Sequence, residues 1–382
     1  MVLAIIDTGV KLDHPELSGR IWENSNETLN GIDDDGNGYV DDNLGWDFVN
    51  QDNNPTDDHG HGTYMAGNAA ANANNNFFYA GVDWNCKLMI LKVGAQNNFF
   101  SYAHAASAIY YAADHGAHII NLSFGGFSSS SILQQSITYA DSMGVVLVAC
   151  SGNNNSSQLW YPARFAETIA VGSIDKNASR SVPFYGASGT GSNYGPELDL
   201  VAPGNSILGL DHLSNSYFFK ISGGTSNSTA FVSGVCGLLL AQDSSRTPLQ
   251  IRQILQQTAM DQIGPPNEDS LGHDIYFGHG AVNAFAALNR QIVSAEELIS
   301  KNVALSIYPN PFQHRLHLTI PDGASYLQIN DLKGSLIFRI EIASGLENFS
   351  IELQSLEEGM YLLSVYDIAG HLSITEKIIR RD

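Results

Sequence analysis

The sequence has 382 residues, of which 39 are acidic and 18 basic, giving a formal net charge of −21. This balance argues against binding to nucleic acids or anionic membranes, because both need basic patches. With 43% hydrophobic residues the chain can bury a sizeable core, and its length allows two or three domains of about 100–200 residues each. No apolar run reaches the roughly 18 residues that would span a bilayer, and the N-terminus shows no signal peptide.

Residues 1–290 alternate short apolar runs with helical patterns. The apolar runs are typical of strands buried on both faces, and strands that alternate with helices predict an α/β fold with a parallel sheet covered on both sides. We expect strands at 4–6, 88–91, 119–122 and 145–148, and helices at 103–115, 132–142, 229–242 and 248–259.

The pattern changes after a polar segment at 291–303, which we interpret as a linker. Residues 304–382 contain short alternating strands at 316–320, 326–329 and 361–365, separated by glycines. This spacing predicts a small all-β sandwich.

The three cysteines, Cys86, Cys150 and Cys236, cannot all pair, and no two have metal-ligand spacing. One disulfide remains an alternative. We expect instead three buried thiols that act as small hydrophobes.

Three segments carry residue types used in nucleophilic catalysis. Asp7 ends the first strand, His61 precedes an Ala/Gly-rich helix start, and Ser226 precedes a strongly helical stretch. A serine hydroxyl is a weak nucleophile, so it needs a base to take its proton and a carboxylate to orient that base. The order Asp, His, Ser along the chain is the order found in subtilisin.

The same segments resemble the motifs of the subtilisin family over most of residues 1–290. The resemblance implies that Asp7 orients His61, that His61 acts as base and then acid, and that Ser226 attacks the scissile carbonyl. His59 is the competing histidine, but in the motif Gly and Thr directly follow the catalytic one. The matching residues are Ala4-Ile5-Ile6-Asp7-Thr8-Gly9-Val10 with His14-Pro15, His61-Gly62-Thr63 with Met65-Ala66-Gly67, and Gly224-Thr225-Ser226 with Val232 and Gly234.

The resemblance also implies an oxyanion donor and a substrate groove. Asn153 follows a predicted strand in a Ser-Gly-Asn segment similar to that of the family, with the Ser226 N–H as second donor. An extended substrate would pair as a β-strand along the primary specificity pocket. Its two expected walls are Ser123, Phe124 and Gly125 on one side, and Cys150, Ser151 and Gly152 on the other.

Several positions depart from the family pattern. Tyr64 replaces a second histidine, and Asn227, Ser228, Ala230 and Phe231 replace the usual residues after the serine. These changes alter packing beneath the nucleophile and leave an alternative open, in which the chain is a catalytically weak or inactive binding protein or adhesin. We predict a secreted serine endopeptidase that acts on proteins or peptides as a monomer.

An Asp-rich segment at 33–42 predicts a structural calcium site. Asp33, Asp35 and Asn37 alternate like positions 1, 3 and 5 of an EF-hand loop, with the Tyr39 carbonyl at 7 and Asp41 at 9. Position 12 is Leu44, so Asp42 or Asp47 is needed to close the shell. The alternative is a solvated turn rich in Asp, Asn and Gly. Residues 72–79 form a weaker second candidate.

Residues from 305 to the end resemble the C-terminal sorting domain of the type IX secretion system of Bacteroidetes-type bacteria. The resemblance implies export across the outer membrane by that machinery, to the cell surface or the medium. A carbohydrate-binding or spacer sandwich is the alternative. Because subtilisin-family proteins carry a leader before the aspartate strand, we expect residues 1–290 to be an N-terminally incomplete catalytic domain. The motifs that carry the resemblance include Tyr308-Pro309-Asn310-Pro311, Asp331-Leu332-Lys333-Gly334 and Glu358-Gly359-Met360-Tyr361.

Overall fold

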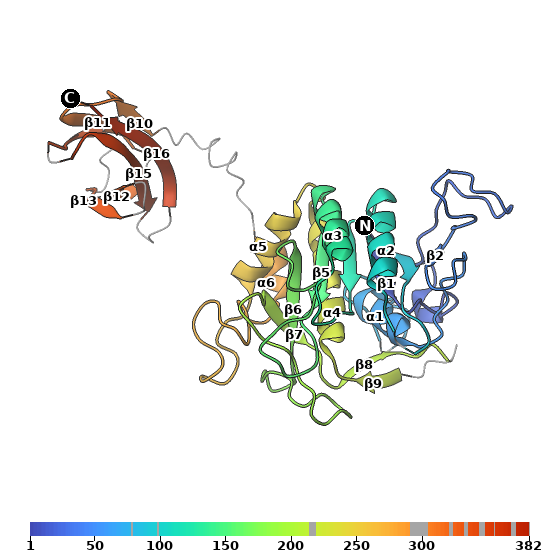
Figure 1. The fold of residues 1–382 in the computed structure, drawn as a ribbon. Coiled ribbons are helices and arrows are strands. Elements are labelled where there is room, and N and C mark those ends of the chain that lie inside the picture. The colour runs from blue at the N-terminus through green and yellow to red at the C-terminus, as the bar shows by residue number, and fades with distance from the viewer. Residues whose placement is uncertain are drawn as a thin grey trace. The chain divides into compact units, whose positions relative to one another are not determined.

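In a computed structural model the chain divides into two compact units, Met1–Arg290 and Gln291–Asp382 (Figure 1). The expected linker at 291–303 lies outside the residues that the structure describes. Those residues are 1–77, 79–97, 99–213, 219–290, 305–320, 324–331, 335–343, 348–354, 356–367 and 372–381.

The first unit is built on a seven-stranded parallel sheet in the order β2-β3-β1-β4-β5-β6-β7 (Figure 1). β1 lies between β3 and β4, in register from Leu3 opposite Leu88 and Ile119. The strands are β1 (Val2–Asp7), β2 (Gly45–Asp47), β3 (Lys87–Lys92), β4 (Ile119–Leu122), β5 (Val146–Cys150), β6 (Thr168–Ile174) and β7 (Leu200–Pro203), with a separate antiparallel hairpin of β8 (Ile207–Leu210) and β9 (Phe219–Ser222).

Helices cover both faces of this sheet. Ala4 and Ile6 join one core with α2 and α3, whereas Leu3 and Ile5 alternate to the opposite face, where α1 and α4 contact β1. All four side chains are fully or almost fully buried. The helices are α1 (His61–Ala70), α2 (Tyr102–Asp114), α3 (Ser131–Ser142), α4 (Thr225–Gln242), α5 (Pro248–Thr258) and α6 (Ala284–Asn289), preceded by a short 3-10 turn at Pro15–Leu17.

The second unit is all β, with two antiparallel sheets in the orders β10-β11-β14 and β13-β12-β15-β16. Alternate residues of both sheets, such as Leu316, Leu327 and Leu363, share one buried core. The strands are β10 (Ser306–Tyr308), β11 (Arg315–Thr319), β12 (Ala324–Asn330), β13 (Leu336–Glu341), β14 (Asn348–Glu352), β15 (Gly359–Asp367) and β16 (Leu372–Arg380).

The predicted fold class is confirmed for both units. α4 begins at Thr225, four residues before the predicted helix start, so Ser226 lies inside its first turn. All three cysteines are buried with free thiols, as expected. Within the ranges given above, no helix has the length and apolar character needed to span a bilayer.

Candidate active site

The Asp7 carboxylate lies at the carboxyl end of the central strand β1 and is completely buried. Its Oδ1 accepts a hydrogen bond from the Thr8 N–H and lies 2.7 Å from Nδ1 of His61, the first residue of α1. In parallel α/β sheets this edge is where sites assemble. The carboxylate contacts His61 and therefore fixes the orientation of one imidazole.

The environment of His61 favours its protonated form. Burial by itself lowers the pKa of the imidazole, but the charge and hydrogen bond of Asp7 outweigh burial and, with a smaller contribution from Asp57, raise the pKa above its ordinary value. The side chain is still 23% exposed, so its other face reaches the solvent side. An imidazole with one nitrogen fixed and the other accessible has the geometry of a general base.

Ser226 lies in the first turn of α4, directly behind a glycine pair. Its Oγ is 3.0 Å from the carbonyl oxygen of Ser123, to which it donates. A cleft of about 560 Å³ brings His61, Ser226 and Asn153 together. The cleft is also lined by His59, Gly60, Tyr64, Met65, Phe100, Ser123, Phe124, Gly125, Trp160, Ile221, Ser222, Gly223, Gly224 and Asn227.

Asn153 is held with its amide nitrogen available to the cleft. Its Oδ1 accepts from both the backbone N–H (2.9 Å) and the hydroxyl (2.8 Å) of Thr225. A Cβ at Gly224 would lie 3.5 Å from Nδ2, so this amino group faces the glycine just before the helix. The arrangement presents an N–H donor next to the N-terminus of α4, where the helix dipole adds positive potential.

Asp57, which we did not predict, joins the strand that carries Asp7 to the helix that carries His61. Its Oδ1 accepts from Thr8 Oγ1 and from the backbone N–H groups of His59 and Gly60, while Oδ2 accepts from the N–H and Oγ1 of Thr63. The carboxylate is 7% exposed and so satisfies the N-terminus of α1 from inside the protein. Its position four residues before His61 was the only sequence signal.

His59 also lines the cleft, but its surroundings differ from those of His61. Its Nδ1 is buried without a hydrogen-bond partner among the described residues. Burial, together with the nearby charge of His61, lowers the pKa of His59 below its ordinary value. Asp7, the buried strand-end carboxylate, contacts His61 and does not contact this ring through any described hydrogen bond.

Tyr64 and Asn227, two of the departures from the family pattern, make hydrogen bonds beside the cleft. The Tyr64 hydroxyl donates to the Ile207 carbonyl of β8 and accepts from the Ser222 N–H of β9, so it holds the two strands of that hairpin. Asn227 donates to Ser222 Oγ and accepts from Asn68. The Asn227 and Ser228 side chains that follow Ser226 are therefore hydrogen-bonded in place.

Of the two predicted walls of the substrate groove, one lines the cleft and the other is buried. Ser123, Phe124 and Gly125 line the cleft itself. Cys150, Ser151 and Gly152 are buried behind it, and the Cys150 thiol contacts the Phe124 carbonyl at 3.6 Å. Their predicted contact with substrate stays a prediction.

Comparison with known proteins agrees with this architecture. Residues 1–280 match the sequence model of the subtilase family. Thermitase from Thermoactinomyces vulgaris is 35% identical over 286 residues, which cover 75% of this chain and 88% of thermitase. The thermophilic serine proteinase of Bacillus sp. (strain AK1) is also 35% identical over 286 residues, but these span only 61% of its length.

The chain belongs to the subtilase family. A crystal structure of a cold adapted subtilisin-like serine proteinase matches this subtilase with a TM-score of 0.57 and 26% identity, covering 74% of this chain and 86% of that one. Subtilases are serine endopeptidases. Residues 306–381 match the secretion system C-terminal sorting domain, which directs type IX export to the cell surface or the medium.

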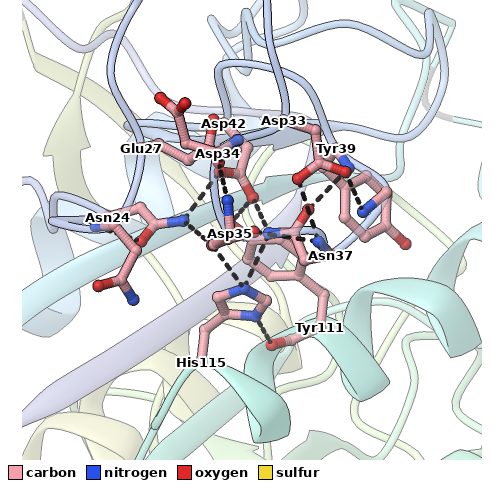
Figure 2. Close-up of polar contacts among 12 residues, drawn as sticks. Asn24, Glu27, Asp33, Asp34, Asp35, Asn37, Tyr39, Asp42, Tyr111 and His115 are labelled. Carbon is pink, nitrogen blue, oxygen red and sulfur yellow. Dashed lines mark hydrogen bonds and ion pairs between the residues drawn. The ribbon is translucent and has the colours of Figure 1, made fainter.

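The Asp-rich loop of this subtilase forms an acidic cluster near α2 (Figure 2). Carboxylate oxygens of Glu27, Asp35 and Asp42 lie within 4.8 Å of one another. Asp42 is fully buried and accepts from the Tyr111 hydroxyl at 2.6 Å. Burial and this carboxylate raise the pKa of the Tyr111 phenol above its ordinary value, so the phenol stays a donor.

Of the three carboxylates among the predicted calcium ligands, Asp35 lies in this cluster, whereas Asp33 and Asp41 accept backbone N–H groups of the loop. The Tyr39 carbonyl as a ligand stays a prediction. Asn37 donates from Nδ2 to Asp42 and accepts the Tyr39 N–H. Asp42 and not Asp47 completes the cluster, because Asp47 pairs with Lys92 on β3. Glu27, outside the Asp-rich run, was missed.

Proposed function

We propose that this exported subtilase hydrolyses proteins or peptides with Asp7, His61 and Ser226 as its catalytic triad. The observation that carries the proposal is the 2.7 Å contact between Asp7 Oδ1 and His61 Nδ1 at a cleft that also contains Ser226. A buried carboxylate, an imidazole and a serine hydroxyl in this chain order are the parts that a nucleophilic serine needs.

In the proposed reaction, Ser226 Oγ attacks the scissile carbonyl carbon while His61 Nε2 takes the hydroxyl proton. Asp7 stays ionised, fixes the imidazole tautomer and stabilises the imidazolium. The oxyanion accepts from Asn153 Nδ2 and the Ser226 backbone N–H, a donor pair of which one member is worth about 3–4 kcal/mol. His61 then protonates the leaving amine, and water attacks the acyl-enzyme in a second cycle.

The Ser226 hydroxyl must turn for this step, because it donates to the Ser123 carbonyl in the structure. Catalytic hydrogen bonds are often loose before substrate binds. A substrate strand lying along Ser123–Gly125 would compete for that carbonyl and release the hydroxyl toward His61.

A fluorophosphonate probe tests the proposal directly. The native protein should be labelled and should digest casein, and Ser226→Ala should abolish both while leaving the melting temperature within a few degrees. Ser222→Ala is the matched control, since it removes a hydroxyl from the same cleft and should keep labelling. Absence of labelling in a folded protein would favour the inactive binding protein or adhesin, held to the cell by its sorting domain.

We further propose that the acidic cluster binds a structural calcium ion. Two of its three carboxylates, Glu27 and Asp42, are buried, and like charges at such separations are costly unless a cation neutralises them. Oxygen donors suit a hard cation, and Glu27, Asp35 and Asp42 would supply them. The ion would fix the loop against α2 and take no part in the chemistry.

Chelation tests the calcium proposal. In a Ser226→Ala background, which prevents autolysis, EGTA should lower the melting temperature by about 5 °C, since an ion at 100 times its Kd stabilises by about 2.7 kcal/mol. Asp42→Asn should remove this sensitivity. Asp34→Asn, in the same loop but outside the cluster, should retain it. An identical melting curve with and without EGTA would contradict the proposal.

We also expect a monomer, which a single sedimenting species of about 41.2 kDa would support.

A further inference from the structure

Trp160 belongs to a segment that connects the two predicted walls of the primary specificity pocket. Its backbone N–H donates to the Ser151 carbonyl at 2.9 Å, on the wall that follows β5. The next residue, Tyr161, exchanges two backbone hydrogen bonds of 2.8 and 3.1 Å with Gly126, which directly follows the opposite wall. The backbone of Trp160 therefore lies between the two walls, and its side chain extends from there.

The Trp160 side chain contacts both walls, through its Cβ on one side and its indole ring on the other. A Cβ at Gly152 would lie 2.7 Å from Trp160 Cδ2, and a Cβ at Gly125 would lie 3.1 Å from Trp160 Cβ. Real Cβ contacts are essentially never below 3.0 Å, so the ring touches the bare Gly152 backbone on one side. Phe127 packs edge-on against the indole, with ring centroids 6.4 Å apart. The ring also lines the cleft that contains Ser226.

The walls are held at this separation, so the pocket cannot widen cheaply. The Cys150 thiol contacts the Phe124 carbonyl across the base, and the Phe124 ring stacks on Phe100 with centroids 5.0 Å apart. Forcing extra volume into a close-packed region costs about 1–3 kcal/mol. A large side chain would therefore have to displace the indole or part the walls.

We propose that Trp160 fills the inner part of the primary specificity pocket, so that this subtilase cleaves after small residues such as Ala, Gly and Ser. This inference rests on the proposed peptidase function. Trp160 acts as a specificity-determining residue: it excludes bulky aromatic and aliphatic side chains by volume and takes no part in bond cleavage.

The test is a series of succinyl-Ala-Ala-Pro-Xaa p-nitroanilides, with Xaa as Ala, Leu or Phe. Wild-type kcat/KM should be at least about tenfold higher for Ala than for Phe, since even one methylene in a pocket is worth about 10–200-fold. Trp160→Ala should raise the Phe/Ala ratio by about 100-fold or more, and Trp160→Phe should give an intermediate ratio. Trp84→Ala, which removes a half-exposed indole, should leave the ratio unchanged.

Two failures are distinguishable. If fluorophosphonate labels Ser226 but the wild-type enzyme prefers Phe to Ala, the pocket inference is wrong and the peptidase function stands. If nothing is labelled or cleaved, the proposed function falls, and this inference falls with it. Should Trp160→Ala not fold, the wild-type series and Trp160→Phe still decide the question.

Discussion

Replacing Asp57 by asparagine should show how much the active site depends on a carboxylate that does not react. The two oxygens of Asp57 accept five hydrogen bonds, from Thr8, His59, Gly60 and Thr63, and Thr63 supplies two of them. The side chain is 7% exposed, so water cannot replace these partners. Asparagine keeps the shape but turns one acceptor into a donor.

The cost follows from which oxygen is lost. If asparagine keeps its oxygen on the three-donor side, its amino group faces the backbone N–H of Thr63, which then has no acceptor. The Thr63 hydroxyl cannot fully compensate, because it already accepts the Lys11 N–H at 2.9 Å. An unsatisfied buried N–H costs about 1–3 kcal/mol and a charge-assisted hydrogen bond about 1.5–3 kcal/mol, so Asp57→Asn should lose about 3 kcal/mol of unfolding free energy.

Activity should fall as well, because Asp57 positions the first turn of α1, and His61 is the first residue of that helix. A misplacement of about 1 Å costs on the order of 100-fold in rate. Because the negative charge of Asp57 also raises the pKa of His61, its removal should move the acid limb of the kcat/KM profile to lower pH.

Thermal unfolding in a Ser226→Ala background measures the loss of unfolding free energy. Kinetics with p-nitroanilide substrates across pH measure the fall in activity and the shift of the acid limb. Asp13→Asn is the control: its side chain is 68% exposed and pairs with Lys11 at 2.9 Å, an ion pair worth about 0–1 kcal/mol. An Asp57→Asn protein as stable and as active as the Asp13→Asn protein would refute the role assigned to this carboxylate.

Two further predictions concern Asp7 and Arg252. His61 must be neutral to act as a base, and its pKa is raised, so wild-type kcat/KM should increase with pH through and above 6.5. Asp7→Asn should lower kcat by about 10⁴-fold and shift that limb toward lower pH; an unchanged profile would contradict the Asp7–His61 pairing. Arg252→Ala should cost about 3–5 kcal/mol in urea or thermal unfolding, because it leaves the buried Asp199 carboxylate without its bidentate partner at 2.6 and 2.9 Å. Arg246→Ala, which removes the partner of the less buried Asp243 carboxylate, should cost under about 1 kcal/mol. Equal losses for the two variants would contradict the argument that burial of the carboxylate sets the cost.

The central part of the fold was predictable because its signals are local. The runs at β1, β3, β4 and β5 are mostly apolar, as is typical of strands covered on both faces. β2, β6, β7 and the β8–β9 hairpin were missed. β2 has only three residues, and the strands of the hairpin are stabilised by Tyr64, which lies more than 140 residues away in sequence.

The residues of the site likewise fall into those that local sequence indicates and those that it does not. Asp7, His61 and Ser226 belong to short motifs, so their sequence neighbours were enough to propose them as a triad. Glu27 and Asp57 acquire their positions from tertiary contacts, which no local pattern encodes. The EF-hand spacing at 33–41 correctly indicated an acidic loop, but the loop turns several of its side chains onto its own backbone N–H groups, so spacing did not identify which oxygens converge.

The position of β1 between β3 and β4 affects how the protein folds. The first strand of the chain cannot complete its pairing until residues up to Leu122 are available, and α4, which packs against five strands of the sheet, starts only at Thr225. Parallel pairings over such sequence distances close large loops and form slowly. Asp7 and Ser226, which lie far apart in the sequence, come together only when the sheet between them has formed. Proteolytic competence would therefore be among the last properties to appear, and partly folded chains would be substrates for proteases and not proteases themselves.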